Sequence, residues 1–146
     1  MLDEDHAQEA AQSRPPMGRP ASRPTRAGSR KLTPITIGSN LTESGTLFVS
    51  NTLTLANGVT LNIGGNQLRI STAPGGIATS GAATVQMNNG TIYSAAGGTA
   101  TIGSGITVQG SGTVSSCCVG SGTLVNNGTI DANVAGQTMT INPSTF

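Results

Sequence analysis

The sequence predicts an all-β fold: a single-stranded parallel β-solenoid of about six rungs, preceded by a disordered or extended N-terminal arm. Three observations lead to this prediction. Short stretches of alternating apolar and polar residues fill the chain from about residue 46 onward, glycine and asparagine separate them, and some of the stretches recur. The predicted domains are an arm over residues 1–31 and a solenoid over residues 32–146.

The strands are predicted from an alternation of period two that is rich in valine, isoleucine and threonine, and we find no helical period in residues 32–146. Asn-Gly and Gly-Gly pairs between the strands supply positions where φ can be positive. Each strand is only a few residues long. The predicted strands are 46–49, 52–55, 59–63, 67–70, 83–87, 91–93, 99–102, 106–108, 113–114, 123–125, 129–130 and 138–141.

Internal repeats favour a solenoid over a sandwich or a barrel. The segment NNGTI occurs at residues 88–92 and again at 126–130, 38 residues later (126 − 88). We interpret this spacing as two turns of about 19 residues each. A second echo, between 53–61 and 100–108, has a 47-residue offset and indicates that rung lengths vary.

The repeated NNGTI segments predict structural corner turns. Asparagine and glycine accept the backbone conformations that a corner needs, and asparagine amides at equivalent corners can stack along the axis. The predicted corner residues are Asn89, Gly90, Asn127 and Gly128.

Composition favours a narrow core. Six of the seven Lys and Arg residues lie at or before Lys31, so Glu43, Arg69 and Asp131 are the only formal charges from residue 32 onward. Aromatic residues are also rare, since the chain has two Phe, one Tyr and no Trp. A core of aliphatic side chains alone must be thin, as in a solenoid, and the regular Val, Ile and Leu content argues against disorder.

The arm differs from the rest of the chain. Residues 13–30 hold four prolines and five arginines, which is typical of an extended, solvated segment. Its charge could attract nucleic acid or an anionic surface, but it has no aromatic residues for base stacking, so we expect no specific nucleic-acid binding. Residues 1–11 begin acidic and lack the apolar region of a signal peptide, and we find no transmembrane segment.

The segment GSGTLVNNGTIDANVAGQTMTINPSTF, residues 120–146, resembles the β-helical repeat segments of bacterial autotransporter passengers and haemagglutinin-like surface proteins. The resemblance extends over about residues 46–146. It implies a right-handed β-helix and an exported protein that is extracellular or at the cell surface. No signal is visible in this chain, so a signal upstream of a fragment, another export route, or no export at all stay open.

Candidate chemistry is sparse, and the sequence predicts no enzyme, no metal site and no cofactor. Glu43 and Asp131 are far apart in sequence for a carboxylate pair, and His6 lies in the arm. The outward pairs Thr52/Thr54, Thr99/Thr101 and Thr138/Thr140 are interpreted as ordinary strand surface rather than as a flat ice-binding ladder.

Cys117 and Cys118 are adjacent, so one side chain faces inward and the other outward on a strand. The inward phase of Val119 assigns Cys117 to the core and Cys118 to the surface. Two inert thiols, an intermolecular disulfide through the outward cysteine, and a strained bridge between the neighbours are the alternatives.

The leading functional hypothesis is a non-catalytic structural subunit that assembles with itself, end to end, into an extracellular filament or surface layer. It rests on the short solenoid, on the absence of an obvious polar cap, and on unpaired strand edges at open ends. The alternative is an adhesin or autotransporter-passenger fragment, a binding module for a cell-surface glycan or protein, for which Tyr93 is the one credible exposed aromatic residue.

Overall fold

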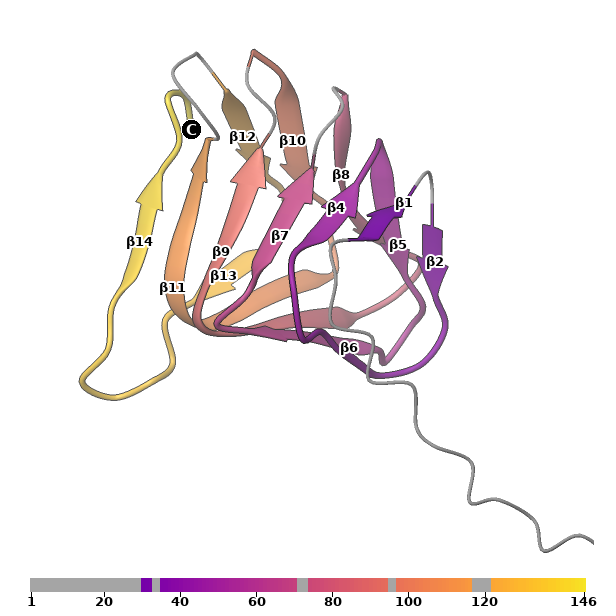
Figure 1. Cartoon of the computed structure of the whole chain (residues 1–146), viewed down its shortest axis with the longest axis horizontal. Coiled ribbons are helices and arrows are strands. Elements are labelled where there is room, and N and C mark those ends of the chain that lie inside the picture. Colours follow the sequence, from indigo (N-terminus) through magenta and orange to yellow (C-terminus); the bar gives the residue numbers. More distant parts are fainter. Residues whose placement is uncertain (1–29, 33–34, 71–73, 95–96, 117–121) are drawn as a thin grey trace, which may run out of the picture.

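The computed structural model describes residues 30–32, 35–70, 74–94, 97–116 and 122–146. All regular structure in these residues is β-strand, and the strands wind into a parallel β-solenoid (Figure 1). The fold class predicted from the sequence is therefore confirmed. The strands are β1 (Arg30–Leu32), β2 (Ile35–Ile37), β3 (Leu41–Thr42), β4 (Leu47–Val49), β5 (Thr52–Leu55), β6 (Thr60–Gly64), β7 (Gln67–Ile70), β8 (Gly75–Thr79), β9 (Ala83–Ser94), β10 (Thr99–Ile102), β11 (Ile106–Ser116), β12 (Thr123–Asn126), β13 (Thr129–Asp131) and β14 (Met139–Asn142).

The strands form two sheets in which every pairing between named strands is parallel. One sheet has five strands in the order β12-β10-β8-β5-β2. The other has nine strands and is folded along its middle, because β9 and β11 each pass through a bend and contribute to both halves. The first half contains β3, β6 and β13, and the second contains β1, β4, β7 and β14, so the solenoid has three sides (Figure 1).

The turns are longer and fewer than the sequence predicted. In the five-stranded sheet Leu53 pairs with Ile77, Ile77 with Ile102 and Ile102 with Asn126, so a circuit takes 24 or 25 residues (77 − 53, 102 − 77, 126 − 102). The predicted period of about 19 residues is wrong, and the chain makes about four turns instead of six. The cause is that β9 and β11, of 12 and 11 residues, continue through corners where the sequence pattern predicted separate strands.

The two copies of NNGTI lie at different places in a turn. Thr91, in the first copy, pairs with Thr113 in the second half of the folded sheet, whereas Thr129, in the second copy, pairs with Thr107 in the first half. The 38-residue spacing is therefore not a whole number of turns. The 47-residue echo is two turns, because Thr60 pairs with Thr84 and Thr84 with Thr107.

Both copies nevertheless use their glycine where the backbones of neighbouring circuits come close. Asn89 has a φ of 60°, at the register shift where β9 bends beside β11. A Cβ on Gly90 would lie 2.5 Å from the carbonyl oxygen of Gly64, and one on Gly128 would collide with the carbonyl oxygen of Ile106. Asn127 donates its backbone N–H to the carbonyl of Ile102, 2.9 Å away.

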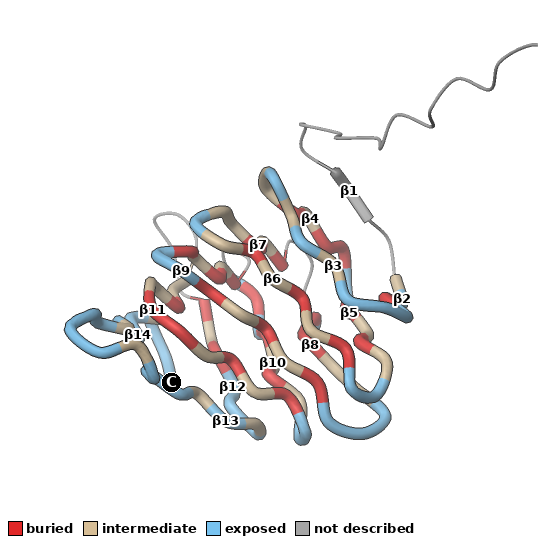
Figure 2. Tube along the Cα trace, turned by 90° about the horizontal axis from the view of Figure 1, so that it is seen from below, coloured by how far each residue is buried: buried red, intermediate tan, exposed pale blue. Residues whose placement is uncertain are grey.

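The core is a stack of aliphatic side chains along the solenoid axis. Figure 2 shows buried and partly exposed residues alternating along the strands, as the period-two pattern predicted. Each buried Leu, Ile or Val contributes about 1.5–3 kcal/mol, and stacked turns share one core that a single turn could not form. The buried apolar residues are Ile37, Leu47, Val49, Leu53, Leu55, Val59, Leu61, Ile63, Leu68, Ile70, Ile77, Ala83, Val85, Met87, Ile92, Ala100, Ile102, Ile106, Val108, Val114 and Leu124.

The first described strand lies at the predicted boundary between arm and solenoid. β1 begins at Arg30 and pairs in register with β4, Arg30 with Leu47 and Leu32 with Val49. Regular structure therefore starts two residues before the predicted solenoid start at residue 32. The rest of the arm, residues 1–29, lies outside the described residues.

Candidate functional site

The two carboxylates predicted to be distant are distant. Glu43 follows Thr42, the first residue of an outward column of register partners that continues through Asn62, Gln86 and Gln109 and ends at Asp131. They therefore stand near opposite ends of the described solenoid. Within the described residues there is no group of three His, Cys, Asp or Glu side chains able to hold a metal ion.

The predicted disulfide candidates, Cys117 and Cys118, lie outside the described residues, as does His6. No helix in the described part of the chain is long and apolar enough to cross a membrane.

The outward column ending at Asp131 contains a ladder of amides. The Nε2 of Gln109 donates to the Oε1 of Gln86 at 2.6 Å, and the Nε2 of Gln86 donates to the carbonyl oxygen of Met87 at 3.1 Å. Parallel register places like side chains one rung apart, about 4.8 Å, which is the spacing that allows amides to bond along the axis. Sequence analysis expected amide stacking at asparagine corners and missed this ladder, whose signal is a Gln two residues after a Thr in both β9 and β11.

A second outward column places a cation between two aromatic rings. Arg69 on β7 is the register partner of Phe48 on β4 and of Tyr93 on β9. The guanidinium carbon of Arg69 lies 5.4 Å from the centroid of the Phe48 ring and 5.5 Å from that of Tyr93. Each such contact is worth about 0.5–1 kcal/mol at an exposed site. The sequence gives all three residues the same outward phase, but the circuit length needed to align them was not predicted.

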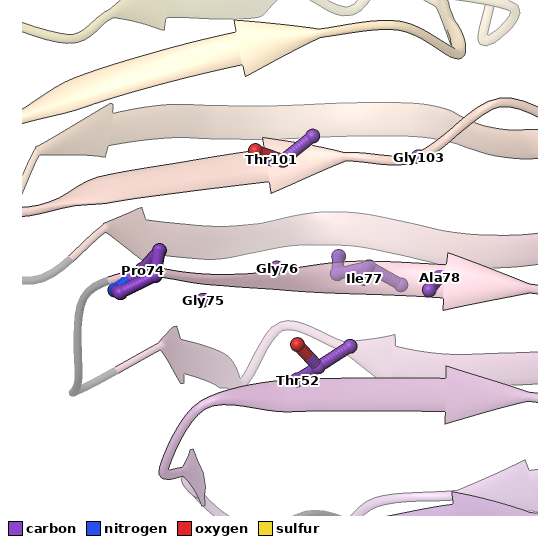
Figure 3. A pocket seen from close by; sticks show the side chains of 8 residues that line it. All are labelled: Thr52, Pro74, Gly75, Gly76, Ile77, Ala78, Thr101 and Gly103. Carbon is purple, nitrogen blue, oxygen red and sulfur yellow. The ribbon is translucent and has the colours of Figure 1, made fainter.

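The five-stranded sheet has a shallow groove of about 290 Å³ on its outer face. Thr52, Gly76 and Thr101 are successive register partners, and the glycine leaves a gap in the column between the two threonine side chains (Figure 3). Gly75, Ile77, Ala78, Gly103 and Pro74 complete the lining. The lining carries few polar groups and no charge, so it offers little for specific recognition.

The predicted Thr pairs do not form one flat array. Thr52 and Thr101 flank this groove, but Thr54 is beside Ala78, and Thr140 lies on the folded sheet beside Thr113. The interpretation as ordinary strand surface agrees with this placement.

The last circuit leaves apolar residues uncovered. Ile141 is the register partner of Val114, a core residue, yet its side chain is 42% exposed. Val125 is 37% and Phe146 is 67% exposed, and these three are the exposed large hydrophobic residues of the part of the chain that the structure describes. Ile130 and Met139, on β13 and β14, are only partly buried (Figure 2).

The first circuit has a matching end. Leu41 on β3 is partly buried and starts the core column that runs through Leu61, Val85 and Val108 to Ile130. β13 and β14 pair with β11 on one side, and no described strand pairs with their other edge. Exposed aliphatic side chains and strand edges thus coincide, which is the arrangement that favours addition of another strand.

Comparisons with known proteins give no match: no family model, no curated protein and no solved structure is significantly similar to this chain. The class that the coordinates define is the parallel β-solenoid.

Proposed function

We propose that this chain is a non-catalytic structural protein, a β-solenoid subunit that stacks end to end into an extracellular filament or surface layer. One observation carries the proposal: Val125, Ile141 and Phe146, the exposed large hydrophobic residues of the described chain, all belong to the last circuit or follow it. Exposed apolar surface of this kind marks interaction sites. The extracellular location is part of the proposal and rests on the resemblance of residues 46–146 to exported surface proteins.

The partner proposed is a second copy, because the two ends continue the same columns. A copy stacked in register would bring its Leu41 against Ile130 and its Thr42 hydroxyl beside the carboxylate of Asp131. The first contact buries two partly exposed aliphatic side chains, and the second supplies a donor to an acceptor. A contact between the two different ends of a molecule does not close on itself and produces a filament.

A matched pair of variants tests the proposal. Ile141→Lys places a charge on the exposed end, and Thr107→Lys places the same charge on an outward position between Thr84 and Thr129. Sedimentation velocity and negative-stain electron microscopy over a concentration series, with reductant, should show rods that lengthen with concentration for wild type and Thr107→Lys. Ile141→Lys should stay monomeric, because stacking would bury the lysine unpaired. Monomeric wild type at every concentration, or equal assembly of both variants, would contradict the proposal.

A binding module for a glycan or protein is the second candidate, and the Phe48–Arg69–Tyr93 column favours it. Aromatic residues and arginine are the side chains most enriched at binding surfaces, and Arg69 is the only cationic residue after Lys31. The expected ligand is an acidic glycan, since a guanidinium binds carboxylates and sulfates. Binding to an array of acidic glycans should be lost in Tyr93→Ala and kept in Thr91→Ala, an outward position on the same strand. Absence of any wild-type binding would remove this candidate.

A further inference from the structure

The strand β1 occupies an edge that end-to-end stacking requires. β4 pairs with β7 on one side and with β1 on the other. In the body of the solenoid that second edge belongs to the corresponding strand of the preceding circuit, as β9 follows β7 and β14 follows β11. In a continuous stack the preceding strand for β4 would be β14 of a second copy. β1 and a second copy's β14 therefore compete for one position.

The register shows which of the two strands fits the core better. The inward column of this half of the sheet runs from Leu47 through Leu68, Ile92 and Val114 to Ile141. β1 places Arg30 in register with Leu47, whereas β14 would place Ile141 there. A charge in the register of a core column is a known way to protect a sheet edge, whereas an isoleucine extends the column.

We propose that the chain assembles by strand exchange: β14 of one copy displaces β1 of the next and pairs with the edge of β4. This inference rests on the proposed function, because it describes how the stacking occurs. β1 is thus a removable cover that delays assembly, and the partner is a second copy of this chain. The exchanged stack also brings β3 onto β13, so both halves of the folded sheet continue without a gap.

The displaced segments are short. β1 has three residues, and at the other end only Thr145 bridges to Thr123, in the place that β2 of the second copy would take. Thr145 accepts a hydrogen bond from the Leu124 N–H at 2.9 Å and donates one to the Gly122 carbonyl at 3.2 Å. Terminal segments with so few contacts open at little cost in free energy.

Pairs of engineered cysteines distinguish exchange from simple docking. Exchange puts Phe48 of one copy beside Asn142 of the other, because both lie in the outward column that contains Arg69, Tyr93 and Ser115. Docking without exchange would put Lys31 beside Asn142 instead. Adjacent register partners are close enough for a disulfide. The variants Phe48→Cys/Asn142→Cys and Lys31→Cys/Asn142→Cys are prepared with Cys117 and Cys118 replaced by serine, oxidised, and run on non-reducing gels.

The expected result is an intermolecular ladder for the Phe48 pair and none for the Lys31 pair. The reverse result would overturn strand exchange and leave end-to-end assembly standing. If neither pair cross-links and wild type also stays monomeric in sedimentation, the proposed function itself fails. If neither cross-links while wild type forms rods, assembly uses another surface and strand exchange is wrong.

Deleting residues 1–32 gives an independent measurement. The critical concentration for assembly should fall about tenfold or more, the effect of losing one or two net backbone hydrogen bonds from the competing state. Arg30→Ile, which matches β1 to the core column, should raise it. An unchanged critical concentration in both variants would overturn the role of β1. Far-UV circular dichroism checks that the deletion variant is folded, and the cysteine pairs decide the question if it is not.

Discussion

At the scale of single residues, the space between neighbouring circuits decides which residue is tolerated. Gly90 is buried at the bend of β9, and its hydrogen atoms face the carbonyl oxygens of Gly64 and Asn66. Both contacts are with backbone, which cannot rotate away as a flexible side chain could. Ser111 stabilises the same bend: it accepts the Asn89 N–H at 3.2 Å and donates to the Oε1 of Gln137 at 2.6 Å.

Gly90→Ala should therefore destabilise the solenoid by about 1–3 kcal/mol, because the new methyl group forces the backbone of the adjacent circuit to shift. Gly38→Ala is the matched control, since a Cβ at Gly38 meets nothing within 4 Å. It should be neutral or slightly stabilising. Urea denaturation followed by circular dichroism measures both. Equal midpoints for the two variants would show that the bend relaxes without cost.

At the scale of strands and turns, the sequence predicts the kind of element better than its length. Alternation correctly located β5, β6, β7 and β10, because each is short, carries Leu or Ile at the inward positions and ends at a turn. β8 was missed because its sequence, GGIAT, has only one large apolar residue. β9 and β11 were each divided in two, because the glycine at the bend was interpreted as the end of a strand.

The same error in length hid part of the candidate site. Local motifs such as NNGTI recur wherever a corner needs them, so their spacing reports corners and not turns. The period of the solenoid is carried by the inward residues, as in the echo between Leu61 and Val108 two turns apart. With the wrong period, Phe48, Arg69 and Tyr93 could not be aligned, although each was singled out by its rarity. The exposed last circuit was predicted only in general terms, as an end without a polar cap.

At the scale of the whole molecule, each circuit contacts only the circuits before and after it. Stability in such a structure is nearly one-dimensional, and the ends have one neighbour instead of two. Figure 2 shows the consequence for burial: exposed residues are concentrated on β13 and β14, whereas β9 and β11 hold the buried centre.

Hydrogen exchange of the monomer should follow this order. Amides of β9 and the first half of β11 should exchange most slowly, and those of β1 and β14 at least about tenfold faster, because the terminal strands open without unfolding the centre. Mass spectrometry of peptic fragments measures the gradient. Assembly should slow exchange in β14 selectively. Uniform protection from end to end would instead indicate one cooperative unit and would contradict local opening of the terminal strands.

The constant register of the columns also makes the length of this rod adjustable in fixed steps. A segment of one full circuit, such as the residues between Ile77 and Ile102, could be removed or duplicated and every remaining side chain would keep its column, inward or outward. A change of any other size would rotate the following strands and carry threonines into the core. Gene variants of this protein that fold should therefore differ by whole circuits, each adding about 4.8 Å, while both ends stay chemically the same.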